Sequence, residues 1–244
     1  MIRYYCSGLA NDDYFGHGLG DMIKKELKDT KCIVFVPGDP NNIDIINEKY
    51  IPLIYDSFKR CGIVFDKEII ITPKMSTKEA KNAIKEANFI MMMGGDPYDE
   101  KEMCEKLDIV DDLRKFDGVM LGSSAGSMYM SKYIIITPCS EDYPEFHIEE
   151  GLNLDNISIY PHNNTNKFRY PKFLAVRDEI YDRDDFITAA KEYGEFYLLQ
   201  DYYREDGLSD VSIIKSVNGR IEIYRENKGR VWLATKDGIK YIKK

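Results

Sequence analysis

The sequence predicts an α/β protein in which a mostly parallel sheet is covered by helices on both faces. Over the first 200 residues, short apolar runs rich in Ile, Val, Met and Phe alternate with longer segments of helical spacing. The runs are continuously apolar, which is typical of parallel strands buried on both faces. Repeated strand–helix–strand units with short connections indicate this layered class.

The first half of the chain supplies five strands and four helices. The predicted strands cover 2–6, 32–37, 67–73, 89–95 and 118–124. The predicted helices cover 20–29, 47–62, 76–87 and 99–118. Four apolar side chains of the second helix are expected on one face: Tyr50, Leu53, Ile54 and Phe58. Gly62 ends this helix, and Ser76 begins the next one through a capping box with Glu79.

The second half continues the pattern and then changes. Strands are predicted at 156–161 and 195–200, with a helix around 170–181 between them. After residue 210 the chain reads as strands separated by Asn-Gly, Asn-Lys-Gly and Lys-Asp-Gly turns, which indicates a β-meander. We find no repeat and no linker, so residues 1–244 are predicted to form one domain.

Composition excludes several classes of protein. The net charge is −8, and Lys and Arg are scattered, so we expect no nucleic-acid partner. There is no secretory signal pattern at the start and no apolar run of membrane-spanning length, so we expect no membrane partner. The five cysteines lack metal-ligand spacing, which predicts reduced thiols in a cytoplasmic protein. They are Cys6, Cys32, Cys61, Cys104 and Cys139.

A serine motif lies within Gly118 to Met130, GVMLGSSAGSMYM. Residues 122–126 match G-x-S-x-G, and they lie between a predicted strand and a segment that can be helical, as a nucleophile elbow requires. We expect Ser124 to project above the carboxyl edge of the sheet, with the Ala125 N–H able to donate to an oxyanion. Ser123 should point away. The alternative is an ordinary tight turn between a strand and a helix.

A serine nucleophile needs a base, and the chain has three histidines. His162 follows a predicted strand, so we expect it at the carboxyl edge of the sheet, where α/β proteins place their sites. His17 lies in a Gly-rich loop and His147 in an acidic stretch, and both are interpreted as surface histidines. His162 is therefore the predicted base.

A second oxyanion donor is expected from a neighbouring strand end. Gly94 and Gly95 end the strand predicted at 89–95. A glycine there exposes its N–H and leaves room for substrate. The alternative is a plain turn with Asp96 as N-cap and Pro97 at the first helical position, and both interpretations can hold together.

These pieces, in this order, resemble the dipeptidase E (α-aspartyl dipeptidase) family of serine peptidases, which includes the cyanophycinases. The resemblance rests on FIMMMGGD, MLGSSAGS and IYPHNN, and on CIVFVP as the second strand. It implies a class I glutamine-amidotransferase-like fold, which is a flavodoxin-like three-layer sandwich. It also implies Ser124 as nucleophile, His162 as base, the N–H groups of Gly95 and Ala125 as oxyanion donors, and no metal or cofactor.

The predicted activity is hydrolysis of small peptides by a cytosolic serine peptidase through an acyl-enzyme on Ser124. One alternative is an esterase or other acyl hydrolase with the same residues. Another is a non-catalytic flavodoxin-like binding module. A glutamine amidotransferase is disfavoured because those enzymes need a cysteine at the elbow. The oligomeric state is left open, with a homodimer among the options.

Two further assignments concern the third catalytic residue and the substrate. Asp201 ends the strand at 195–200, whereas Glu141 and Asp142 lie in a polar loop. A strand end holds an acid more rigidly, so Asp201 is preferred and Asp142 is second. By resemblance, Arg169 would recognise an acidic side chain of the substrate, since an arginine fork suits a carboxylate. The alternative is a solvated basic loop. Asp96-Pro97-Tyr98 departs from the family pattern, so side-chain preference stays open.

Overall fold

The computed structural model describes residues 1–9, 15, 18–137, 145–162, 183–203, 209–225 and 228–243. Its largest element is a seven-stranded sheet, called the main sheet below, with the order β13-β12-β1-β5-β4-β2-β3. Its strands are β1 (Ile2–Cys6), β2 (Cys32–Gly38), β3 (Lys67–Ile70), β4 (Phe89–Gly95), β5 (Val119–Ser123), β12 (Ser212–Val217) and β13 (Arg220–Arg225). The first five run parallel, while β12 pairs antiparallel with β1 and β13 antiparallel with β12.

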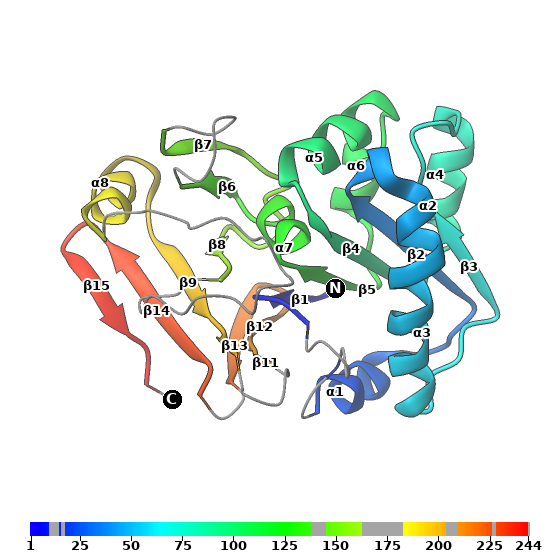
Figure 1. Cartoon of the computed structure of the whole chain (residues 1–244), viewed down its shortest axis with the longest axis horizontal. Helices are drawn as coiled ribbons and strands as arrows, with labels where there is room; N and C mark the ends of the chain where they lie inside the picture. Colours follow the sequence, from blue (N-terminus) through cyan, green and yellow to red (C-terminus); the bar gives the residue numbers. More distant parts are fainter. Residues whose placement is uncertain are drawn as a thin grey trace.

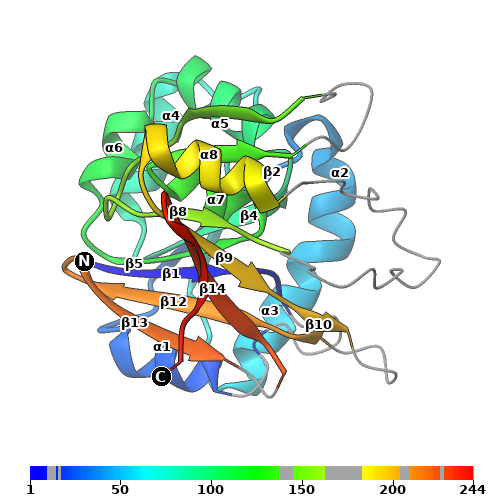
Figure 2. The ribbon, with the colours of Figure 1, turned by 90° about the vertical axis from the view of Figure 1, so that its left-hand side faces the viewer.

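Helices cover both faces of the main sheet, as Figure 2 shows. One face is covered by α1 (Leu19–Glu26) and by α3 (Ile51–Arg60), which α2 (Ile43–Ile45) and a π-helical turn (Ile46–Tyr50) precede. The other face is covered by α4 (Thr77–Glu86), α5 (Pro97–Lys106), α6 (Val110–Lys115) and α7 (Ala125–Met130). Two apolar cores result, one on each side of the sheet. The α/β class with mostly parallel strands is therefore confirmed.

A second sheet lies beside the main one, at the left of Figure 1. Its order is β15-β14-β9-β8, formed by β8 (Ser158–Tyr160), β9 (Phe196–Gln200), β14 (Arg230–Thr235) and β15 (Gly238–Tyr241). The helix α8 (Arg183–Tyr193) packs on this sheet through Phe186, Ala189 and Ala190. The two sheets meet where the hydroxyl oxygen of Ser212 lies 2.9 Å from the Gln200 carbonyl of β9 and 3.0 Å from the Arg230 carbonyl of β14.

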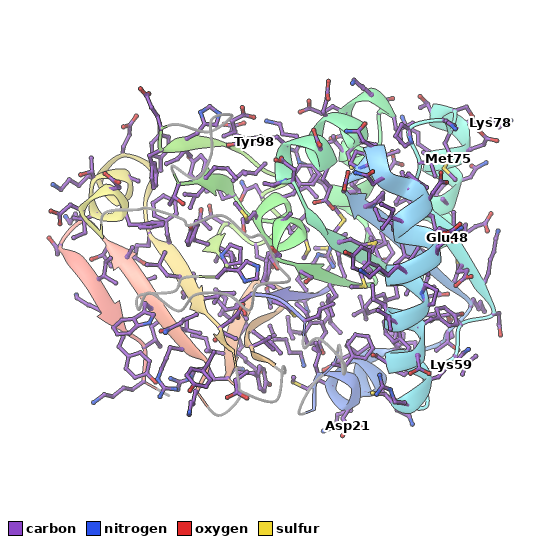
Figure 3. All side chains as sticks on the ribbon, in the orientation of Figure 1. Asp21, Glu48, Lys59, Met75, Lys78 and Tyr98 are labelled. Atoms are coloured by element: carbon purple, nitrogen blue, oxygen red, sulfur yellow. The ribbon has the colours of Figure 1, made fainter. Side chains whose placement is uncertain are left out.

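Two small two-stranded units complete the fold. One pairs β6 (Tyr133–Ile136) with β7 (His147–Glu150), and the other pairs β10 (Tyr202–Tyr203) with β11 (Ser209–Asp210). The β6–β7 hairpin rests against α5, where Tyr98 is labelled in Figure 3. The rings of Tyr98 and His147 lie 5.4 Å apart. Lys101 and Glu149 form a 2.7 Å ion pair at the same contact. No helix among the described residues is long and apolar enough to cross a membrane.

The structure corrects four local expectations. The segment 99–118 forms two helices instead of one, because Asp108 adopts a left-handed backbone with φ 55° between them. The predicted apolar face on α3 is wrong in part: Tyr50 and Leu53 are 39% and 43% exposed, and Ile51 is buried instead. The other two corrections concern how strands pair.

The C-terminal strands form two hairpins instead of one continuous meander. The hairpin β12–β13 extends the main sheet, whereas β14–β15 joins β9 in the second sheet. Similarly, β8 pairs with β9 and not with a strand of the main sheet, so His162 follows a strand of the second sheet. The helix expected around 170–181 lies outside the described residues.

Candidate active site

The elbow between β5 and α7 holds Ser124 in a backbone conformation that few non-glycine residues adopt. Its φ is 51° and its ψ is −113°. Its N–H donates to the Cys6 carbonyl of β1 at 3.1 Å, which ties the strained residue to the neighbouring strand. Strain of this kind persists only where the surroundings impose it, and it is common at functional sites.

The glycine at the end of the motif is required by close packing. A Cβ on Gly126 would overlap the Met92 carbonyl of β4, so only glycine lets the first turn of α7 lie this close to the sheet. The G-x-S-x-G pattern is thus explained here by the approach of α7 to the main sheet. Ser123 is buried, with 6% of its surface exposed.

His162 lies between Ser124 and Asp201. Its Nε2 lies 2.8 Å from the Ser124 Oγ, and its Nδ1 lies 2.6 Å from the Asp201 Oδ2. The side chain of His162 is 23% exposed, whereas that of Asp201 is 2% exposed. The structure therefore brings together the predicted nucleophile, the predicted base and the preferred acid in one hydrogen-bonded chain.

This arrangement selects one tautomer of the imidazole. An ionised carboxylate only accepts hydrogen bonds, so Nδ1 carries the hydrogen that faces Asp201. In the neutral ring, Nε2 is then left with a lone pair, which can accept the hydroxyl hydrogen of Ser124. The geometry is suited to removing a proton from the serine.

The two glycines at the end of β4 lie beside the elbow. A Cβ on Gly94 would be 3.6 Å from the Ser124 Cβ, and a Cβ on Gly95, whose φ is 150°, would overlap the Gly38 carbonyl. Asp96 is the N-cap of α5, accepting from the N–H of Tyr98 at 2.8 Å, and Pro97 takes the first helical turn. The capping interpretation is therefore confirmed, and the role of Gly95 as an oxyanion donor stays a prediction.

Carboxylates gather where β2 and β4 end. Burial raises the pKa of Asp99, and the nearby charges of Asp96 and Asp39 raise it further. Asp39 follows β2, and Asp96 follows Gly95 directly. The carboxylates of Asp39, Asp96 and Asp99 are therefore close enough to influence one another where β2 and β4 end.

Several predicted residues lie outside the described ones. They are Arg169, Asp142, Glu141, His17 and Cys139. His147 is exposed and pairs with Glu149 at 3.1 Å, as expected of a surface histidine. In the part of the chain that the structure describes, no three His, Cys, Asp or Glu side chains are grouped as metal ligands would be.

The residues where β1 ends were missed as site residues by the sequence analysis. Cys6, Ser7 and Gly8 contact the site, as described below, although the strand at 2–6 was predicted. A signal was available, because a polar residue directly follows a buried strand there, as it does at Ser124 and Asp201.

Fold and site together define a serine hydrolase built on a mostly parallel α/β sheet. The model of peptidase family S51 matches residues 6–186, which is most of the chain, so the chain belongs to that family. The family comprises serine-type peptidases of the dipeptidase E and cyanophycinase type. The protein is therefore a serine-type peptidase.

Solved structures share the fold at low sequence identity. A peptidase E candidate from Listeria monocytogenes EGD-e has a TM-score of 0.59 and 13% identity, over 93% of this chain and 98% of that one. A peptidase from an acI-B1 Actinobacterium has a TM-score of 0.60 and 14% identity, over 99% and 93%. No curated protein matches the chain. The class I glutamine-amidotransferase-like fold is thereby confirmed.

Proposed function

We propose that this peptidase hydrolyses short peptides, with dipeptides as the preferred class, through an acyl-enzyme on Ser124. The observation that carries the proposal is the hydrogen-bonded chain, with 2.8 Å between Ser124 and His162 and 2.6 Å between His162 and Asp201. Family membership supports peptide substrates. The dipeptide class rests on the resemblance to the dipeptidase E family, and one structural neighbour is described as a peptidase E candidate.

Each residue has a role that follows from its position. His162 accepts the Ser124 proton at Nε2 while Oγ attacks the scissile carbonyl carbon. The N–H groups of Ala125 and Gly95 stabilise the oxyanion of the tetrahedral intermediate. His162 then gives its proton to the leaving amine, and the acyl-enzyme remains. A water molecule, deprotonated by His162, attacks the ester and releases the acid and the free serine.

Asp201 acts through His162. Its carboxylate fixes the imidazole with Nδ1–H toward the acid and stabilises the imidazolium that forms in each proton transfer. We propose Asp201 as the third catalytic residue in preference to Asp142 and Glu141. The support is the 2.6 Å contact with Nδ1 and the burial of Asp201 at the end of β9.

A fluorophosphonate probe combined with substrate assays tests the proposal. The probe should label Ser124, identified by peptide mass spectrometry, and labelling should vanish in Ser124→Ala and persist in the matched control Ser123→Ala. Asp-X and Leu-X dipeptides, tetrapeptides and simple esters are then compared. Faster turnover of esters than of any peptide would favour the acyl hydrolase alternative. Absence of labelling with an intact fold would favour a binding module.

The substrate charge is tested at Arg169. We propose that Arg169 pairs with an acidic side chain of the substrate, an assignment that rests on the family resemblance. Arg169→Ala should lower the rate for Asp-X dipeptides relative to Leu-X dipeptides. An unchanged ratio would mean that this residue belongs to a solvated basic loop.

We also propose a cytoplasmic location and one domain, both supported by the sequence. Two buried cysteines, Cys32 and Cys104, are free thiols. Cell fractionation tests the location, and a single cooperative unfolding transition tests the domain.

A further inference from the structure

Asp201 has a partner on each carboxylate oxygen. Its Oδ2 faces His162, and its Oδ1 accepts a hydrogen bond from the Ser7 hydroxyl. Only 4% of the Asp201 surface is exposed. A buried carboxylate is costly unless its oxygens are hydrogen-bonded, so Ser7 satisfies the oxygen that His162 does not reach.

The direction of the Ser7 hydrogen bond is fixed by its other neighbour. Ser7 is fully buried directly after β1, and its oxygen accepts the Ser212 N–H at 3.0 Å. The Ser7 N–H in turn donates to the Ser212 carbonyl at 2.9 Å. A hydroxyl has one hydrogen, and the N–H of Ser212 cannot receive it. The hydrogen therefore goes to Asp201.

The neighbours of Ser7 contact the rest of the site. The Cys6 carbonyl accepts the Ser124 N–H at 3.1 Å. A Cβ on Gly8 would be 3.2 Å from the His162 Cε1, so the missing side chain makes room for the imidazole. Cys6 and Ser7 thus bond to Ser124 and Asp201, and Gly8 leaves space for His162. Because β1 belongs to the main sheet while His162 and Asp201 follow strands of the second, this contact crosses between the sheets.

We propose that Ser7 is a positioning residue of the peptidase, which holds the Asp201 carboxylate at the angle that orients His162. The proposal rests on the function proposed above. Ser7 does not touch the substrate and acts only through Asp201. Losing the bond lets the carboxylate turn about its side-chain torsions, and misplacement by about 1 Å can cost about 10²-fold in rate.

Steady-state kinetics on Ser7→Ala, Asp201→Asn and the double variant test this role. Ser7→Ala should lower kcat by about 10²-fold with little change in KM. Added to Asp201→Asn, it should lower kcat no further, because a residue that acts through Asp201 has nothing to position once that carboxylate is gone. A kcat within twofold of wild type for Ser7→Ala overturns the proposal. The proposal is also overturned if the loss of kcat in the double variant equals the product of the losses in the two single variants.

A matched control separates positioning from stability. Ser216 is also a fully buried serine, on β12, and its hydroxyl donates at 2.6 Å to Asp155, which is not part of the site. Ser216→Ala removes an equivalent bond and should destabilise the fold without lowering kcat. If Ser7→Ala does not fold, Ser7→Cys replaces it, because sulfur occupies the site but donates weakly. Ser7→Cys should show the same loss of kcat, and it should lower kcat no further when it is combined with Asp201→Asn.

The two proposals fail in different ways. Wild-type hydrolysis by Ser124→Ala overturns the proposed function itself. An inactive Ser124→Ala beside a fully active Ser7→Ala leaves that function standing and removes only the role of Ser7.

Discussion

The two sheets contribute different halves of the candidate site. The main sheet supplies Ser124 after β5 and Gly95 at the end of β4, which would attack and stabilise the carbonyl group. The second sheet supplies His162 after β8 and Asp201 after β9. His162 would transfer the proton, and Asp201 would stabilise the imidazolium that forms. Figure 1 shows the two sheets side by side.

The halves are held by different means. The serine is positioned by a five-residue motif. The backbone of Ser124 is strained, and the absence of a side chain on Gly126 lets the start of α7 pack closely on β4. The base and the acid depend on how the second sheet docks, through contacts such as Ser7 with Asp201 and Ser212 with Gln200. The nucleophile geometry therefore depends on a short motif packed within the main sheet, whereas proton transfer also depends on contacts between the two sheets.

The largest effect on kcat is expected in the half of the site that the main sheet supplies. Ser124→Ala should lower kcat by about 10⁶-fold, because the attacking oxygen is gone. Thermal unfolding should change little, since the variant removes one hydroxyl group from a partly buried residue and adds no new atoms. Ser123→Ala, one residue earlier, is the control and should stay within a few-fold of wild type. Comparable rates for the two variants would place the nucleophile elsewhere.

The next effect concerns the acid of the second sheet. Asp201→Asn keeps the shape but favours the wrong imidazole tautomer, which can cost about 10⁴ in turnover. Asp142→Asn should cost clearly less. Dipeptide hydrolysis at saturating substrate measures both. A larger loss in Asp142→Asn than in Asp201→Asn would show that the loop acid orients His162.

Two variants that create cavities test whether proton transfer depends on how the second sheet packs against the main sheet. Leu198 of β9 and Ile84 of α4 are 1% and 3% exposed, and each belongs to an apolar core. Truncation of either to alanine should destabilise the protein by about 2–5 kcal/mol. Leu198→Ala should also lower kcat about tenfold, because a small shift of β9 moves Asp201 away from its optimum. Ile84→Ala should leave kcat unchanged.

Both variants are compared at a temperature where each is fully folded by circular dichroism. Equal kcat values would mean that the second sheet tolerates repacking without moving its catalytic groups. The contrast drawn between local and long-range positioning would then be lost.

The smallest expected effect is on thermal stability and concerns Glu100, a buried carboxyl that lies outside the candidate site. Glu100 of α5 is fully buried near Cys104 and Tyr129, and neither oxygen has a hydrogen-bond partner among the described residues. Burial raises the pKa of Glu100 well above its ordinary value of 4.5. The unfolded chain therefore loses this proton first, and stability falls as the pH rises above 4.5.

Glu100→Gln should remove that pH dependence. Its Tm should exceed that of wild type by about 2–4 °C at pH 8, and the two should agree near pH 4.5. The measurement is thermal unfolding at both pH values, with kcat expected to be unchanged. A lower Tm for Glu100→Gln at pH 8 would contradict the assignment of Glu100 as a neutral, unpaired acid.

The sequence predicted what is encoded locally. Strands β1 to β5, the capping box at Ser76 and the elbow at Ser124 each depend on neighbouring residues, and the structure contains all of them. His162 and Asp201 were found by their place after apolar strands. The structure places those strands in another sheet than expected, yet both side chains still reach the site.

The features that the sequence did not predict depend on contacts between residues far apart in the chain. Turn residues identify hairpins but not the strand that each hairpin joins, so the division of β12–β13 from β14–β15 could not be read from the sequence. Ser7 was missed because its partners, Ser212 and Asp201, are about two hundred residues away. Tyr50 and Leu53 share the helical period of buried residues, and only the packed neighbours decide which side faces solvent.

The pairing of β1 with β12 has a consequence for the order in which the chain is made. Ile2 pairs with Val217, so during synthesis β1 lacks one neighbour until β12 has also left the ribosome. Asp201 and the strands that support it emerge equally late, although domains otherwise tend to fold from the N-terminus during synthesis. A nascent chain carrying the Ser124 elbow alone has no oriented base. Under the proposed function, peptide cleavage therefore requires that β9 and Asp201 have been synthesised, and we expect a polypeptide truncated before residue 201 to be inactive.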